Sequence, residues 1–182
     1  YKALPRQNFI DDLTWAKLER LGLTPSQPAP DHTFLRRTYL DIIGRVPTPD
    51  ETRAFLGDVA PDKRVKLVDQ LLARPEYADY WTLKWADVLR NNRKTLQLKG
   101  SHVFHDWIRN HIVRNTGWDD VVKELLTAEG STFSNPPANY YRVHKDSSML
   151  AEATAQLFLG VRIECAKCHH HPFEKYRQDD YY

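Results

Sequence analysis

The chain has 182 residues, of which 41% are hydrophobic and 27% are charged, so it can bury the core of one large domain or two small ones. Its 26 Lys and Arg residues nearly balance its 24 Asp and Glu residues. This net charge of +2, without a basic block, argues against a nucleic-acid binder. The sequence has no apolar run of about 18 residues, so we expect no membrane span.

The spacing of apolar residues predicts helices along nearly the whole chain. Local signals mark several helix ends, such as Asn8 as an N-cap, Gly22 and Gly44 as stops, and a capping box from Thr48 to Glu51. The predicted helices cover residues 8–21, 31–44, 48–56, 62–73, 76–91, 101–116, 118–127 and 147–159. With about eight helices and no convincing strand, we expect an all-α, irregular multi-helix fold.

Three segments separate these helices: a proline-rich connector at 24–30, a polar stretch at 92–100 and an irregular stretch at 129–144. The chain starts at a tyrosine rather than a methionine, and a further helix begins where it stops. We therefore expect residues 1–182 to form a single domain within a longer protein.

The chain contains only two cysteines, and they form the run Cys165-Ala166-Lys167-Cys168-His169. This spacing is the attachment signature of a c-type haem. Two thiols on one turn can each add to a vinyl group at the same edge of a porphyrin, and the next imidazole then reaches the iron. The sequence thus predicts one covalent haem c on Cys165 and Cys168, with His169 as the proximal ligand.

Other uses of this run stay open. Cys165, Cys168 and some of the histidines at 169–171 are suitable zinc ligands, although no second compact ligand cluster exists. A redox dithiol is a second alternative, but such a motif normally lies in a βαβ unit, whereas the preceding segment is predicted to be helical. A plain disulfide would close a very small loop and stabilise little.

The segments around this run resemble the planctomycete cytochrome c-like domain family of the second type. The similarity extends over about residues 8–182, and its most specific part combines Leu159-Gly160, the cysteine run and His171-Pro172-Phe173. Similar segments lie upstream, at residues 37–49, 85–90 and 104–108. The resemblance implies a mostly helical haem domain unlike the small cytochrome c. It also implies an exported protein in which a second planctomycete-specific domain usually follows.

The sixth ligand of the iron decides the chemistry, because a closed site favours electron transfer and an open one admits small ligands. In small cytochromes c a methionine follows the haem run, but here Met149, the only methionine, precedes it. His105 is our first candidate, because it lies between Phe104 and Trp107 and matches a segment of the family. His144 and Met149 are the alternatives.

Further residues are candidates for contacts with the haem. His171 is expected to form a local hydrogen bond or to contact a propionate, and Arg162 and Lys167 are candidate propionate partners. Trp81, Trp85 and the pair Tyr140-Tyr141 are candidate haem walls, although aromatic residues at helical spacing more often belong to the core.

We expect a one-electron transfer domain that serves a redox partner protein or the adjacent downstream domain. One alternative is a haem enzyme or sensor with an open sixth position, either peroxidase-like or gas-binding. Another is a cell-surface interaction module in which zinc or haem only staples the fold. Because this type of haem is attached outside the bacterial cytoplasm, the expected location is periplasmic, cell-surface or secreted. Catalysis stays open, with electron transfer favoured.

Overall fold

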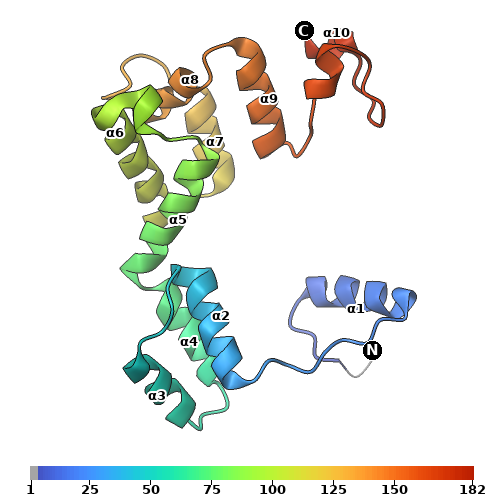
Figure 1. Ribbon diagram of the computed structural model, residues 1–182, viewed down its shortest axis with the longest axis vertical. Helices are drawn as coiled ribbons and strands as arrows, with labels where there is room; N and C mark the ends of the chain where they lie inside the picture. The colour runs from blue at the N-terminus through green and yellow to red at the C-terminus, as the bar shows by residue number, and fades with distance from the viewer. Residues whose placement is uncertain (1–3) are drawn as a thin grey trace.

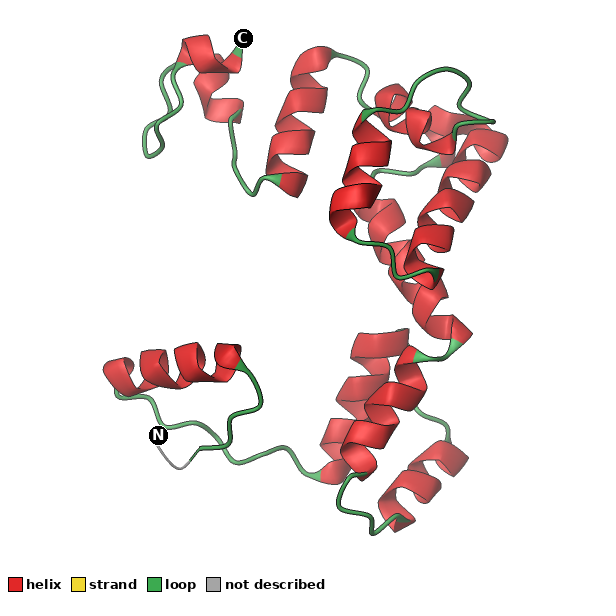
Figure 2. Ribbon diagram, turned by 180° about the vertical axis from the view of Figure 1, so that it is seen from behind, coloured by secondary structure: helices red, strands yellow, loops and turns green. Residues whose placement is uncertain are grey.

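The computed structural model describes residues 4–182 (Figure 1). Within this range the chain forms ten α-helices and two 3-10 helices and no strand, which confirms the all-helical prediction (Figure 2). In chain order the helices are α1 (Phe9–Leu21), α2 (Asp31–Ile43), α3 (Pro49–Gly57), α4 (Lys63–Leu72), α5 (Pro75–Val88), α6 (Arg93–Val113), α7 (Trp118–Leu126), η1 (Pro136–Ala138), α8 (Asn139–Val143), α9 (Ser147–Phe158), η2 (Glu164–Lys167) and α10 (Gln178–Tyr181).

Several helices begin and end at the predicted residues. Asn8 and Thr48 form capping boxes at α1 and α3, and Gly22 and Gly44 end α1 and α2 with φ of 66° and 71°. These left-handed values favour glycine because it has no Cβ. Asp31 is not the cap of α2, since Pro30 holds that position and the Asp31 carboxylate instead pairs with Lys63 and Arg64 on α4.

The first hydrophobic cluster joins α2, α3 and α4. It consists of Leu35, Tyr39, Ile43, Phe55, Leu67 and Leu71, all of them buried. On α4, Leu67 and Leu71 face the cluster, whereas Val65 is 63% exposed and Leu72 is also exposed. Helix α2 packs against both α4 and α5, so the cluster lies beside the first half of α5.

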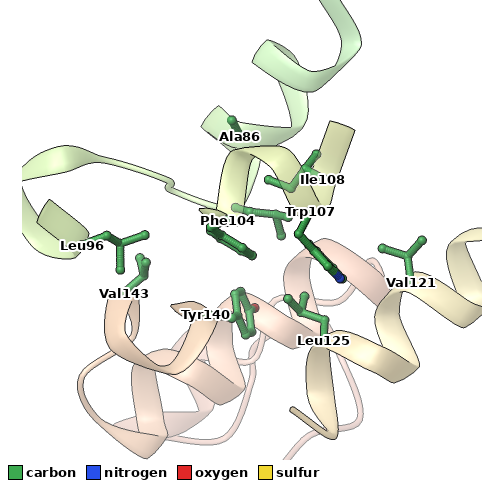
Figure 3. Packing of buried hydrophobic residues seen from close by; sticks show 10 residues of the cluster. Ala86, Leu96, Phe104, Trp107, Ile108, Val121, Leu125, Tyr140 and Val143 are labelled. Carbon is green, nitrogen blue, oxygen red and sulfur yellow. The ribbon is translucent and has the colours of Figure 1, made fainter. Parts of the chain in front are cut away.

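The second hydrophobic cluster joins α5, α6, α7 and α8 (Figure 3). Its buried members are Ala86, Leu89, Leu96, Phe104, Trp107, Ile108, Val121, Leu125, Tyr140 and Val143. Tyr140 is fully buried in it and comes from α8, inside the stretch at 129–144 that was predicted to be irregular. That prediction is wrong for residues 136–143, which form η1 and α8.

Helix α6 also departs from the prediction, because it begins inside the polar stretch at 92–100. The Asn92 side chain accepts a hydrogen bond from the Thr95 N–H and caps it. The helix is interrupted at Gln97, whose φ of 61° and ψ of 177° are not helical. The backbone therefore turns here and then continues as the helix that carries Phe104 and Trp107.

The two ends of the chain bury few residues, although Leu150 and Phe158 of α9 pack against the second cluster. Helix α1 buries no residue and is separated from α2 by the connector at 24–30 (Figure 1). At the other end, α9 buries only Ala155 and leads into a terminal segment, residues 159–182, which contains η2 and α10. Among the described residues, no helix combines the length and apolar character needed to cross a membrane.

Candidate haem-attachment site

The two cysteines lie on a short turn that follows α9. The chain reverses at Gly160, whose φ is 68°, and the Val161 N–H donates back to the Ala155 carbonyl at 3.2 Å. Cys165 lies within η2 and Cys168 is its C-terminal cap, and both are exposed free thiols. Between them Ala166 is fully buried, so the turn is anchored while both thiols face solvent. Both thiols are thus accessible to one planar group.

His169 presents one free ring nitrogen. Its Nδ1 lies 2.7 Å from the carbonyl oxygen of His170. Because a carbonyl can only accept a hydrogen bond, this Nδ1 carries a proton, and in the neutral ring Nε2 keeps its lone pair. A metal-bound histidine commonly donates its other ring N–H to a carbonyl in this way. The His169 ring is therefore in the tautomer that an iron ligand requires.

The next two histidines hold the loop. His170 Nδ1 accepts the Gln178 N–H at 3.2 Å, and His171 Nδ1 accepts the Phe173 and Glu174 N–H groups at 3.2 and 3.0 Å. In the neutral rings the proton is then on Nε2, so neither ring offers a free lone pair. The Nε2–H of His171 can still donate to a propionate.

The two cations expected near the haem differ in their surroundings. Within residues 4–182, Arg162 forms no hydrogen bond or ion pair, so its guanidinium is available to a carboxylate. Lys167 Nζ lies 3.8 Å from Glu152, and the Tyr181 hydroxyl donates to the same carboxylate at 2.5 Å. Tyr181 and then Glu152 raise the pKa of Lys167. Lys167 thus ties the terminal segment to α9.

Of the three candidate sixth ligands, Met149 is the one that shares a cavity with residues next to the cysteine run. Met149 lines a cavity of about 160 Å³ together with Arg162 and Glu164, the residue before Cys165. His105 lines a different hollow between α5 and α6, with its Nδ1 3.5 Å from Asp106. Figure 1 shows α9 between α6 and the terminal segment, so this structure does not bring His105 to the run.

His144 is a buried histidine whose ring nitrogens have no hydrogen-bond partner. Only 4% of the residue is exposed, and its ring packs edge-on against Tyr140 with 4.7 Å between the centroids. Burial, followed by the charge of Arg90, lowers the pKa of His144, so the ring is neutral. Arg90 also lines the Met149 cavity, which places His144 on the same side of the second cluster.

The aromatic candidates lie elsewhere. Tyr140 belongs to the second cluster, where its hydroxyl lies 3.2 Å from the Thr154 hydroxyl. The Tyr141 hydroxyl donates to the Leu126 carbonyl, and Trp81 and Trp85 line a pocket between α5, α6 and α7. These contacts are with the protein core and do not involve the cysteine run.

Sequence reasoning missed Arg90 and Glu152 as neighbours of the run. Arg90 has a positive φ of 55° in the turn after α5, and no spacing rule connects it to residues 75 positions later. Within residues 4–182, no three His, Cys, Asp or Glu side chains are arranged to hold a metal ion. A zinc ion would therefore have to draw its ligands together on binding.

Residues 9–182 match the family PSCyt2, described as a protein of unknown function (DUF1549). The chain belongs to this family. PSCyt2 is the planctomycete cytochrome c-associated domain family, and the match covers α1 to α10, including both cysteines. Separate comparisons with curated proteins and with solved structures found no significant match.

Proposed function

We propose that this PSCyt2 chain carries one covalent haem c and transfers single electrons. The observation that supports this most directly is the state of residues 165–169. Two exposed free thiols lie on one anchored turn, and the next ring has its Nδ1 proton donated to a carbonyl and its Nε2 free. Zinc could use the same thiols and ring, but within residues 4–182 no three His, Cys, Asp or Glu side chains are arranged to hold a metal ion.

Each residue has a defined task. Cys165 and Cys168 would hold the haem through thioether bonds to its two vinyl groups, each thiol hydrogen passing to the adjacent vinyl carbon. His169 would bind the iron through Nε2. Arg162, which forms no other ion pair within residues 4–182, neutralises a propionate. The bound haem supplies a reversible one-electron couple between ferric and ferrous iron.

Met149 is the sixth ligand that the surroundings of the run favour. It shares a cavity with Arg162 and Glu164, whereas His105 belongs to α6, and Figure 1 shows α9 between α6 and the terminal segment. A methionine ligand raises the reduction potential relative to a second histidine. If the sixth position is open instead, the domain is a haem sensor or a peroxidase-like enzyme, and added carbon monoxide or cyanide shifts its spectrum.

The proposed location is outside the cytoplasm, because thioether attachment takes place there. The electron donor or acceptor is then a periplasmic or cell-surface redox protein, or a domain that follows in the same polypeptide. The family name, which refers to a cytochrome, is consistent with this assignment.

The test is to export the chain from a bacterial host that attaches haem c, and then to measure the intact mass and the oxidised and reduced absorption spectra. We expect the mass to exceed that of the bare chain by one haem, and Cys165→Ser with Cys168→Ser to abolish this gain. His169→Ala should change the coordination spectrum, while the matched His170→Ala should not. A colourless wild-type protein with the bare mass, or with stoichiometric zinc, would disprove the proposal.

A further inference from the structure

A second site lies between α5, α6 and α7, apart from the cysteine run. Tyr77, Trp81 and Trp85 recur every four residues on α5 and face a solvent-open pocket of about 230 Å³. Trp118, the first residue of α7, also lines the pocket, and its ring contacts that of Trp85 with centroids 3.5 Å apart and planes tilted by 31°. Trp118 is 38% exposed, so part of its ring remains open to solvent. The walls are therefore broad, flat and aromatic.

Polar atoms without partners accompany these walls. The Trp81 Nε1 and His111 Nδ1 atoms are both buried, and neither has a hydrogen-bond partner among the described residues. His111 Nε2 is 3.1 Å from Glu124, so Nδ1 is an acceptor in the neutral ring. Both side chains line the pocket, so a ligand that enters it can supply the missing donor and acceptor once small side-chain adjustments open the two nitrogens to it.

The remaining lining supports a ligand with hydroxyl groups. Asn115 and Thr116 line the rim, and no side-chain hydrogen bond involves either residue within residues 4–182. Asn115 has a φ of 49°, in the left-handed region that Asn tolerates best among residues with a side chain. This turn fixes the position of the amide beside the tryptophans.

The pocket does not select a charged ligand. Its nine lining residues include no Asp, Glu, Lys or Arg. A cation or an anion would lose its hydration here without gaining an opposite charge. The volume lies below the roughly 300–1,000 Å³ of sites for drug-sized ligands, so the pocket itself has room for about one small ring.

The pocket continues into a larger hollow. A cavity of about 700 Å³ shares Tyr77, Ile112 and Asn115 with the aromatic pocket and extends towards the end of α4. Its lining also includes Arg74 and Arg109, both of which are already paired with carboxylates. A ligand bound at the tryptophans can thus extend along the surface. This favours a chain of several units over a single ring.

We propose that this groove binds a neutral carbohydrate. One sugar ring stacks its apolar face on Trp118, and its hydroxyl groups accept from Trp81 Nε1 and donate to His111 Nδ1. Asn115 and Thr116 contact the hydroxyl groups at the rim, and further sugar units occupy the neighbouring hollow. This site is independent of haem attachment, since none of its residues belongs to the terminal segment.

The test uses the full chain and neutral oligosaccharides of glucose, galactose, mannose and xylose, with one to six units, in isothermal titration calorimetry. At least one series should bind, with affinity increasing with length. Trp118→Ala should weaken this binding about tenfold. Trp81→Phe, which keeps a ring but removes the indole N–H, should weaken it severalfold.

Trp15→Ala provides the matched control, because Trp15 lies on α1 outside the pocket and its replacement should leave binding unchanged. Circular dichroism verifies that each variant is folded. Choline and inorganic phosphate serve as charged probes. The proposal fails if no series binds, if the pocket variants bind as well as wild type, or if a charged probe binds and its binding alone depends on Trp118.

Discussion

Hydrogen bonds distinguish the three adjacent histidines at 169–171, whose side chains are chemically identical. His169 donates from Nδ1, whereas His170 and His171 accept at the same ring position. Binding iron through His170 or His171 would require a proton at Nδ1 and would break the hydrogen bonds that shape the loop. For the proposed haem, these hydrogen bonds favour His169 over His170 and His171 as the proximal ligand.

The identity of the sixth ligand gives the first prediction at this scale. Met149→Ala should lower the reduction potential and shift the iron towards high spin, because the thioether that favours ferrous iron is lost. The matched variant His105→Ala should leave both unchanged. Electrochemistry and the absorption spectrum of the haem-loaded protein measure these effects. The opposite pattern would return His105 to the position of sixth ligand.

His144 gives a prediction about pH. Because burial lowers the pKa of His144 in the folded state, the unfolded chain binds its proton first as the pH falls below about 6.5. The free energy of unfolding should therefore decrease with acidification, by at most about 1.4 kcal/mol per pH unit. His144→Phe keeps a ring against Tyr140 and removes the titration, so its advantage over wild type should grow from pH 7 to pH 5.

Urea denaturation at several pH values between 5 and 7 measures the difference in the free energy of unfolding between His144→Phe and wild type. Tyr140→Phe is the control, since it alters the same contact without changing the histidine. A constant difference between His144→Phe and wild type over this range would show that His144 is not buried in its neutral form.

At the scale of elements, Glu51 on α3 pairs with two arginines that lie outside this helix. Its carboxylate accepts hydrogen bonds from Arg45 and from Arg74, each at 2.8 Å. These contacts, with Arg45 the largest cause, hold the pKa of Glu51 well below its ordinary range. Glu51 also closes the capping box with Thr48. One side chain thus joins the start of α3 to the α4–α5 junction.

Glu51→Gln is expected to preserve the capping box and remove the charge. At pH 7 it should lower the free energy of unfolding by about 1–2 kcal/mol. A lowered pKa means that this contribution is complete above about pH 4.5 and is lost as the pH falls further. The difference between Glu51→Gln and wild type should therefore shrink progressively as the pH falls below about 4.5. A difference that stays constant between pH 5 and pH 2 would contradict the ion-pair explanation.

Helix ends marked by local chemistry were predictable from sequence, whereas elements stabilised by distant contacts were not. The capping box at Thr48 and the glycine at position 44 act within a few residues, and both were recognised. Helix α8 has only five residues and is unremarkable in sequence. It forms because Tyr140 is buried between α6 and α7, a contact that no local pattern encodes.

At the scale of the whole molecule, α1 contributes nothing to either cluster. Removing residues 1–23 should therefore shift the thermal midpoint by less than about 2 °C. For comparison, Leu35→Ala in the first cluster should cost about 2–5 kcal/mol. Differential scanning calorimetry of the two variants distinguishes these cases. A large loss of stability on removal of α1 would show that it packs onto the body of the protein.

In the candidate site, too, some features depend on neighbouring residues in sequence and others on long-range contacts. Cys165, Cys168 and His169 are contiguous, so their shared turn could be predicted from the sequence alone. The surroundings of the run include Arg90, Met149 and Glu152, which come from α9 and from the end of α5. Their proximity depends on how α9 packs, and for this reason the sequence favoured His105.

Helix α5 lies beside the first cluster through Tyr77 and contributes Ala86 to the second. When the chain leaves a ribosome or a translocation channel from its N-terminus, helices α2 to α4 emerge before α5, the second helix against which α2 packs. The second cluster can form only after Tyr140 has emerged. A nascent chain that stalls between these points exposes unfinished apolar surface, and it is at this stage that a holdase chaperone would bind it.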